Sequence, residues 1–471
     1  TAGTHMFTAG ATWNAGTMNS AGTTTNAAGS TFVIATGADH DFNQRSIVNN
    51  GVVNWQQGRL RSGTGVTVTN NNIWNDTNSG TADLNNDYGG ATLVFTNAAG
   101  GTYNKTGAGT TRFLVPLTNN GNFNLGAGTT QIHAGGTFGN GSSQTGTAPF
   151  QLVAGTITAT GTMSLSNFQM TGGAIAGIHT LNGGITWTAG NFNNTGATTI
   201  GASGTFTIAS ANDHDLNSHT FVNDGVVNWS AGQIRGGTGA TFTNSATFND
   251  AASSVVNNAY GGTAFAFINA PNGTYNKTGA GTTRFDAAFN NNGLVNVDAG
   301  TLQINGGGTQ GGTGTFAADA GAVVDFSNSH TITDGSKLTG AGTYRISGGT
   351  VSLAGAVAAS NLQIVGGNTT GSHTFTAGAT WNAGTMNAAA TTTNAAGSTF
   401  VIATAADHDY NQRSIVNNGI VNWTGGRLRG GNSSSITNNA TWNDSASNVF
   451  NNDYLCVRVS CNVVGSGNGR N

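Results

Sequence analysis

The chain has 471 residues, of which only 7% are charged, and its formal net charge is −3. This near-neutral balance, without a basic stripe, argues against a nucleic-acid partner, and no apolar run approaches the roughly 18 residues of a membrane helix. The sequence contains no Glu, 75 Gly and 3 Pro. Gly, Asn and Thr punctuated by Val, Ile, Phe and Trp favour short strands joined by tight turns, so we predict an all-β fold.

The sequence repeats itself over long intervals, which suits a chain too long for one ordinary domain. The first and second copies are offset by 174 residues, and the second and third by 194. Six tryptophans mark two matched positions in the copies: Trp13, Trp55, Trp187, Trp229, Trp381 and Trp423. We expect repeats at 1–174 and 175–368, a partial third repeat at 369–454 and a divergent tail at 455–471, all in one continuous array.

The additional length of the second repeat equals about one shorter period. The segment 101–113 recurs at 273–285 with an offset of 172, whereas Asn167 matches Asn361 at 194, so some 22 residues are inserted between these points. Asn-rich turn signals in the first repeat recur every 21 to 27 residues. A solenoid gains a whole coil without disturbing the others, because each coil contacts only its neighbours. We therefore predict a parallel β-solenoid of about 20–23 residues per coil, with one extra coil in the second repeat.

Strand geometry gives this solenoid definite dimensions and an interior. With strands about 4.8 Å apart and roughly 21 coils, a rod would be on the order of 100 Å long. Apolar residues and the tryptophans are expected to stack inside it, with Asn49, Asn50 and Gly51 at a corner where Asn ladders form. The alternative for the tryptophans is an exposed sugar-stacking platform. The run Asn49-Asn50-Gly51 is also a hairpin signal, which would instead give an antiparallel meander, sandwich or propeller.

The most concentrated charges follow the pattern Asp-His-Asp, which occurs at 39–41, 213–215 and 407–409. Arg45, Arg59 and Arg61 follow the first copy. Carboxylates beside a histidine suit acid/base chemistry or Ca²⁺ binding, and the candidate calcium ligands are Asp39, Asp41, Asp213, Asp215, Asp407 and Asp409. The alternative is ion pairing of each carboxylate with an arginine of the next coil. Three copies favour pairing, because a catalytic site is normally built once.

The other chemically active residues give weaker signals. His5, His179 and His373 recur once per repeat without a Cys or a second His nearby, which makes a poor zinc site, so we expect them in the core or at corners. Thr-rich segments suit a flat hydroxyl surface, but no strict pattern recurs and Thr is a good strand residue. Cys456 and Cys461 are the only cysteines, and their spacing does not determine whether they pair.

Two segments resemble a known class of repeats. The sequences NNNGLVNVDAGTL at 290–302 and GAGTY at 340–344 are similar to the repeats of large bacterial surface proteins, namely autotransporter passengers and filamentous-haemagglutinin-like adhesins. The resemblance implies a right-handed β-helix, export to the bacterial cell surface, and adhesion or matrix building. It brings no defined binding residues with it.

Residues 1–5 align with 369–373, so the chain opens within the array, and nothing there resembles a polar cap. We expect either an array that continues in a longer parent or an end that stacks on another copy. The sequence thus predicts a non-enzymatic extracellular structural protein without cofactors. It would be an adhesin stalk or a filament subunit that self-associates end to end, with surface glycans as further partners. The competing hypotheses are a β-helix enzyme acting on polysaccharide and a carbohydrate- or ice-binding module.

Overall fold

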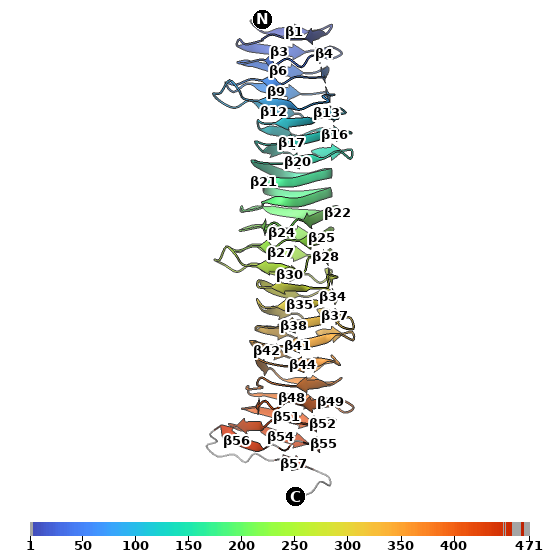
Figure 1. The fold of residues 1–471 in the computed structure, drawn as a ribbon, viewed down its shortest axis with the longest axis vertical. Coiled ribbons are helices and arrows are strands. Elements are labelled where there is room, and N and C mark those ends of the chain that lie inside the picture. The colour runs from blue at the N-terminus through green and yellow to red at the C-terminus, as the bar shows by residue number, and fades with distance from the viewer. Residues whose placement is uncertain (1–2, 446, 448, 455–462, 466–471) are drawn as a thin grey trace. The chain divides into compact units, whose positions relative to one another are not determined.

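The computed structural model describes residues 3–445, 447, 449–454 and 463–465. The chain forms two compact units, Thr1–Arg235 and Gly236–Asn471. No described residue is helical, and neighbouring strands pair in parallel (Figure 1). Paired strands are about 21 residues apart, and the two units together comprise about 21 solenoid turns. The predicted parallel β-solenoid is confirmed, and the antiparallel hairpin interpretation of the Asn-Gly run is wrong.

Up to β20 (Phe150–Leu152), the coils of the first unit form three faces, and every coil but the first contributes one strand to each face. The first face begins with β1 (His5–Phe7) and continues through β3 (Gly22–Asn26), β6 (Arg45–Asn49), β9 (Thr67–Asn70), β12 (Val94–Asn97), β15 (Leu117–Asn119) and β18 (Gly136–Phe138). The second face holds β2 (Ala11–Trp13), β4 (Thr31–Ile34), β7 (Val52–Trp55), β10 (Ile73–Asp76), β13 (Thr102–Lys105), β16 (Asn122–Leu125) and β19 (Ser143–Thr145). The third face holds β5 (His40–Asp41), β8 (Leu60–Arg61), β11 (Ala82–Asn85), β14 (Thr110–Phe113), β17 (Thr129–Ile132) and β20 (Phe150–Leu152).

The later coils of the first unit contain fewer residues per turn, and their strands are longer. Phe150 pairs with Phe168, only 18 residues further on, within a strand that runs round successive coils without a break. The strands of this region are β21 (Thr156–Asn191), β22 (Ala197–Ala209), β23 (His214–Asp215), β24 (Thr220–Asn223), β25 (Val226–Ala231) and β26 (Ile234–Arg235).

The second unit repeats the three-faced arrangement. Its first face holds β27 (Thr241–Asn244), β30 (Ala266–Asn269), β33 (Ala288–Asn291), β36 (Gly308–Gln310), β39 (His330–Ile332), β42 (Thr350–Leu353) and β45 (Asn368–Thr370). Its second face holds β28 (Thr247–Asp250), β31 (Thr274–Lys277), β34 (Leu294–Val297), β37 (Thr315–Ala318) and β40 (Lys337–Thr339). Its third face holds β29 (Val255–Asn257), β32 (Thr282–Phe285), β35 (Thr301–Ile304), β38 (Val323–Phe326), β41 (Thr343–Ile346) and β44 (Leu362–Ile364).

Twelve further strands complete the second unit: β43 (Gly355–Val357), β46 (His373–Phe375), β47 (Ala379–Trp381), β48 (Ala390–Asn394), β49 (Thr399–Ile402), β50 (His408–Asp409), β51 (Arg413–Asn417), β52 (Ile420–Trp423), β53 (Leu428–Gly431), β54 (Ser435–Asn438), β55 (Thr441–Asp444) and β56 (Phe450–Tyr454), followed by β57 (Val463–Gly465). The third face takes four pairing steps from β32 to β44. The matching stretch of the first unit takes three, from β14 to Phe168. One more coil therefore lies in this part of the second unit, while the boundaries of the sequence repeats stay a prediction.

The core follows from the alternation of side chains along each strand. Most four-residue strands bury every second residue, as in β7, where Val53 and Trp55 point inward. Aromatic rings from successive coils then pack on one another: Phe123 stacks on Tyr103 at 4.7 Å and on Phe150 at 5.0 Å. The six repeat-marking tryptophans are at most 7% exposed. They fill the interior and present no sugar-stacking platform.

Each of these tryptophans makes the same local hydrogen bond. The Trp55 indole nitrogen donates to the carbonyl oxygen of Gly58 at 3.0 Å, and Gly58 has a φ of +82°. The other five tryptophans also donate to a glycine three residues later, and each of those glycines has a positive φ: Gly16, Gly190, Gly232, Gly384 and Gly426. Glycine adopts this conformation without steric cost, so it lets the chain turn back over the indole.

Asparagine amides form hydrogen-bonded columns inside the corner after the first face. Asn49 Nδ2 donates to Asn70 Oδ1 at 2.8 Å, and Asn26 Nδ2 donates to Asn49 Oδ1 at the same distance. The column continues to Asn97 and Asn119, and two similar columns in the second unit join Asn244 to Asn291 and Asn394 to Asn438. Asn49 is fully buried, so the amide ladder supplies the partners that buried polar groups require.

Gly51 has a different role from the turn glycines. Its φ is not positive, but a Cβ there would lie 2.3 Å from the carbonyl oxygen of Ser30 and 2.4 Å from that of Ala27. Its N–H donates to Asn49 Oδ1 at 3.1 Å. The corner at Gly51 therefore requires glycine because the coils approach closely there, and not because of a left-handed turn. Asn50 lies outside the column and accepts a hydrogen bond from Asn71 Nδ2 at 2.8 Å.

Candidate functional site

The Asp-His-Asp carboxylates of the first copy lie on the third face, opposite two arginines of the following coil. Arg59 binds both oxygens of Asp39 at 2.8 Å. Arg61 binds both oxygens of Asp41 at 2.8 and 3.1 Å, and it also reaches Asp39 Oδ2 at 3.1 Å. A guanidinium group fits a carboxylate in this two-point manner. The hydrogen bond from Arg59 lowers the pKa of Asp39 below its ordinary value, so this carboxylate is charged at neutral pH.

The histidine between the two carboxylates points the other way. His40 is fully buried, and its Nε2 lies 3.1 Å from the carbonyl oxygen of Trp13. Its ring stands edge-on to the Trp13 indole, with the centroids 4.8 Å apart. Burial lowers the pKa of His40. Because alternate side chains point to opposite sides of a strand, the pattern does not assemble an acid/base pair between His40 and its neighbours Asp39 and Asp41.

The ion pairing returns in the other two copies. In the second copy Gln233 stands where the first arginine would be, and Arg235 contacts both carboxylates. The pairs and their shortest N–O distances are Arg235–Asp215 2.7 Å, Arg235–Asp213 2.8 Å, Arg427–Asp407 2.6 Å and Arg429–Asp409 2.6 Å. All six candidate calcium ligands thus bind arginine. Within the described residues, no three His, Cys, Asp or Glu side chains are grouped so as to hold a metal ion.

Arg45 does not take part in these surface ion pairs. The sequence grouped it with Asp39 and Asp41, but its side chain is fully buried on the first face. Its nitrogens contact the carbonyl oxygen of Met18 at 3.1 Å, Thr24 Oγ1 at 3.2 Å and His5 Nε2 at 3.1 Å. The physical reason is strand alternation, since Arg45 is in phase with the inward residues of β6.

The third copy contains the same buried arginine. Arg413 donates to the carbonyl oxygens of Met386 at 2.9 Å, Gly371 at 3.2 Å and Thr369 at 3.1 Å, and to Thr392 Oγ1 at 2.8 Å. Burial lowers the pKa of Arg413 to about 10. Backbone carbonyl groups, and not a carboxylate, solvate this charge. The side chain thereby connects its own coil to residues more than 40 positions earlier in the chain.

In the second copy His219 takes the place of the arginine, and it lies near His179, the counterpart of His5 and His373. Thr198 Oγ1 lies 3.0 Å from His179 Nε2 and 2.9 Å from His219 Nε2, and all three side chains are buried. Burial lowers the pKa of both histidines to about 4. His373 of the third copy is also buried and contacts Thr392. The predicted core position is therefore correct for His179 and His373, while their polar partners were not predicted.

The least expected cluster is a buried lysine and aspartate at the ends of two neighbouring strands. Asp76 ends β10, Lys105 ends β13, and both side chains have no exposed surface. Lys105 Nζ lies 3.4 Å from Asp76 Oδ1, while the Tyr103 hydroxyl donates to Asp76 Oδ2 at 2.6 Å and the Thr111 hydroxyl donates to the same oxygen. Asn78 donates to Oδ1 through its side chain at 2.8 Å and its backbone N–H at 3.0 Å.

A second copy of this cluster lies in the second unit. Asp250 accepts hydrogen bonds from Tyr275 at 2.7 Å and from Thr283 at 2.6 Å. Lys277 is also buried, but its Nζ donates to the carbonyl oxygen of Gly279 and lies 3.5 Å from Ser253 Oγ. Burial raises the pKa of Asp250 and lowers that of Lys277. Lys105 Nζ also donates to the Asn78 carbonyl oxygen at 3.2 Å. Both clusters contain Asp, Lys, Tyr and Thr, but Ala252 stands in place of Asn78, and only the Lys105 amine also contacts its aspartate.

The sequence does carry a signal for these clusters. The tripeptides Trp74-Asn75-Asp76 and Tyr103-Asn104-Lys105 align residue for residue across two coils. With an aromatic residue pointing inward, strand alternation places the third residue inward as well. Opposite charges at that third position predict a buried ion pair, which our sequence analysis missed.

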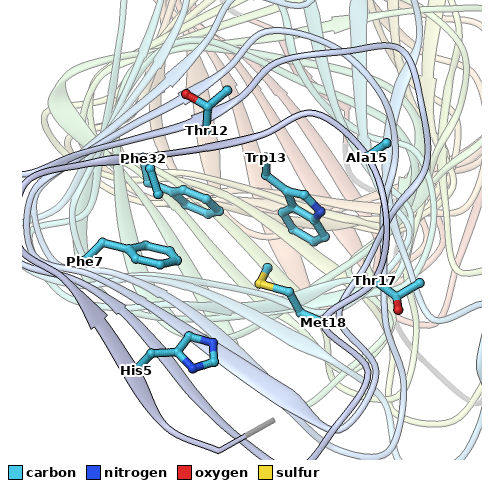
Figure 2. A pocket seen from close by; sticks show the side chains of 9 residues that line it. His5, Phe7, Thr12, Trp13, Ala15, Thr17, Met18 and Phe32 are labelled. Carbon is cyan, nitrogen blue, oxygen red and sulfur yellow. The ribbon is translucent and has the colours of Figure 1, made fainter. Parts of the chain in front are cut away.

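One cavity opens at the first coils of the first unit (Figure 2). Its volume is about 290 Å³, and Figure 2 shows Phe7, Trp13, Met18 and Phe32 pointing into it, while Thr12 points away. β1 pairs with β3 and β2 pairs with β4. The described residues place no strand on the other edge of β1 or β2. The cavity is therefore lined by inward-facing apolar side chains of the first described coils.

Cys456 and Cys461, and most of the divergent tail at 455–471, lie outside the described residues. In the described part, no helix is long and apolar enough to span a membrane. The chain matches no family model, no curated protein and no solved structure in the comparisons with known proteins. The functional argument therefore rests on the contacts themselves.

Proposed function

We propose that this chain is a load-bearing structural β-solenoid on the outside of a bacterial cell, and that it acts without catalysis as an adhesin stalk or a filament subunit. The observation that carries the proposal is the pairing of charged side chains between successive coils. Each of the six carboxylates in the repeated Asp-His-Asp pattern binds an arginine of the following coil. The lattice thus connects successive coils and leaves no free carboxylate pair for general acid/base chemistry at these positions.

Contacts inside the solenoid support the same role. Asn ladders, buried arginines and the Asp76–Lys105 pair all join residues of different coils. Parallel strands add a backbone ladder on each face. Pulling along the axis would have to break many such contacts, and a protease would find few backbone segments that leave the ladders. These properties suit a stalk or a fibre.

The cavity of Figure 2 suggests how a filament could form. It is lined by Phe7, Trp13, Met18 and Phe32, and it lies beside strand edges that can accept a further parallel strand. A second copy stacked there would bury apolar side chains and pair backbone groups at once. Surface glycans are then proposed as ligands of the side faces.

Electron microscopy at increasing protein concentration tests the filament form. The variant Thr12→Lys places a charge on the open edge of β2, which disfavours strand addition. Thr380→Lys is the matched control, because Ala379-Thr380-Trp381 repeats the sequence of β2 and β47 pairs on both sides. We expect fibres from the wild type and from Thr380→Lys, and separate particles from Thr12→Lys.

Separate wild-type particles at every concentration would overturn the filament form. Limited proteolysis tests the structural role itself, which both forms share. The proposal expects residues 3–445 to survive as a long resistant fragment under native conditions. Rapid cleavage at many sites within that range would contradict a load-bearing solenoid, whatever the microscopy shows.

A further inference from the structure

We propose that Lys105 and Asp76 form an intramolecular amide (isopeptide) bond that covalently joins two successive coils of the first unit. The reacting groups are Lys105 Nζ and the side-chain carboxyl carbon of Asp76. The inference is independent of the proposed function, because it rests on the chemistry of one buried cluster. It assigns to this pair a covalent role in place of an ordinary ion pair.

The geometry brings the two groups within reacting range. Nζ lies 3.4 Å from Oδ1, the oxygen bonded to the carbon that it would attack, and an intramolecular reaction gains from holding its groups in contact in this way. Both side chains are fully buried and extend from strands that align residue for residue, Asp76 opposite Lys105. The surrounding coils therefore hold the amine against the carboxyl group and exclude competing water.

Burial also favours the uncharged form of the amine that must react. A neutral amine is the nucleophile, and a protonated carboxyl group is the better electrophile. Burial lowers the pKa of Lys105, and an ion pair in a dry interior is costly relative to its neutral form. Transfer of one proton from the ammonium group to Oδ1 gives the neutral pair without any outside reagent.

The bonds then change in a balanced sequence. The Nζ lone pair adds to the carboxyl carbon, and negative charge collects on Oδ2, where the Tyr103 and Thr111 hydroxyls donate. A second proton passes from nitrogen to Oδ1, the bond between carbon and Oδ1 breaks, and one water leaves. The nitrogen keeps one hydrogen as an amide N–H, and Oδ2 becomes the amide oxygen.

Hydrogen bonds assign different roles to the two oxygens. Asn78 holds Oδ1 through two N–H groups, at 2.8 and 3.0 Å, which fixes the carboxyl plane against Nζ. Burial raises the pKa of Tyr103 well above its ordinary value, so its hydroxyl keeps its proton and remains a donor throughout. Tyr103, Thr111 and Asn78 are therefore positioning residues in this reaction.

The Asp250 cluster of the second unit serves as an internal control for this inference. Tyr275 and Thr283 donate to Asp250 as their counterparts do to Asp76, and the backbone N–H of Ala252 replaces the donors of Asn78. Lys277 Nζ donates to the Gly279 carbonyl oxygen and not to Asp250. The amine is turned away from the carbon it would attack. We therefore expect an amide bond at Lys105 and a free amine at Lys277 in the same molecule.

Mass spectrometry of the full chain tests the inference directly. The purified protein, aged at neutral pH and then fully denatured, is expected to be lighter than its sequence by the mass of one water. Trypsin does not cleave after an acylated lysine, so residues 62–112 should remain one peptide that lacks one water. Cleavage after Lys277 should be normal. Fragmentation of peptide 62–112 must place the link between Asp76 and Lys105, which separates it from a cyclised aspartate.

The variant Lys105→Met should restore the full mass and leave the digestion after Lys277 unchanged. If the folded wild type keeps its full mass and is cleaved after Lys105 as readily as after Lys277, the inference is overturned. The wild-type measurement is sufficient to test the inference, so the test does not depend on whether the variant folds. A link at Lys277 with none at Lys105 would overturn it equally.

Discussion

The ion pairs on the surface and the polar clusters in the interior use similar side chains under opposite conditions. Asp39 and Arg59 are paired while about a third and two fifths of their side chains remain exposed, at 32% and 42%. Asp76 and Lys105 are paired with no exposure at all. An exposed pair contributes about 0–1 kcal/mol, whereas removing one member of a buried pair costs about 3–5 kcal/mol. Pairs that look alike in the sequence therefore differ several-fold in their effect on the free energy of unfolding.

The comparison also separates two ways of neutralising a buried charge. The Asp76 carboxyl group faces the amine of Lys105, while Arg413 is solvated by three carbonyl oxygens and a hydroxyl group. Carbonyl groups that turn toward a guanidinium come from several coils, so the arginine fixes the relative position of those coils. In the second copy the Thr198 hydroxyl contacts two neutral histidines, so this interior position contains no charged group. The same interior position is thus filled in chemically different ways.

The largest effect is expected from breaking a buried cluster. Asp250→Ala removes the acceptor of the buried Tyr275 and Thr283 hydroxyls and the negative charge that acts on the buried Lys277 amine. The free energy of unfolding should fall by about 3–5 kcal/mol. Asp286→Ala is the control, because Asp286 forms an exposed pair with Arg284 and should cost at most about 1 kcal/mol. The denaturation midpoint of each variant, followed by tryptophan fluorescence, measures the difference. Equal losses in the two variants would remove the distinction between interior and surface.

The sequence predicts the ion pairs on the surface but not the polar clusters in the interior. The coil period places Asp39 and Arg59 in register, so their pairing follows from spacing. The inward position of Arg45 was missed because a charged residue was assumed to face solvent. Its place is set by the phase of the strand that it begins, in which Ile47 and Asn49 also point inward. The carbonyl groups that receive an inward arginine come from other coils and leave no mark in the sequence.

An intermediate effect is expected from acid. The pKa of His179 and of His219 is about 4 in the folded chain, below the value of about 6.5 of an unperturbed histidine. Between these values the unfolded chain binds more protons, so stability should decrease as the pH falls from about 6.5 to 4. A shift of this size corresponds to at most about 3 kcal/mol for each histidine. The denaturation midpoint at pH 7 and at pH 4.5 measures the loss.

His219→Gln keeps a side chain that can hydrogen-bond Thr198 and removes one of the two titrating groups. The difference between the midpoints at pH 7 and pH 4.5 should therefore become smaller in this variant. Other buried histidines, such as His330 and His373, retain their part of the acid effect. An unchanged pH dependence in His219→Gln would mean that His219 does not remain neutral in the folded chain.

The smallest effect is expected from the surface lattice. Asp39→Ala removes one carboxylate, but Arg61 keeps its two-point contact with Asp41 and Arg59 is free to turn into solvent. The loss should be below about 1 kcal/mol, and it should shrink further in high salt, because salt screens exposed charges. Denaturation midpoints measured at low and high ionic strength check both statements. A loss of several kcal/mol that persists in high salt would show that the surface ion pairs stabilise the coils as strongly as the buried clusters do.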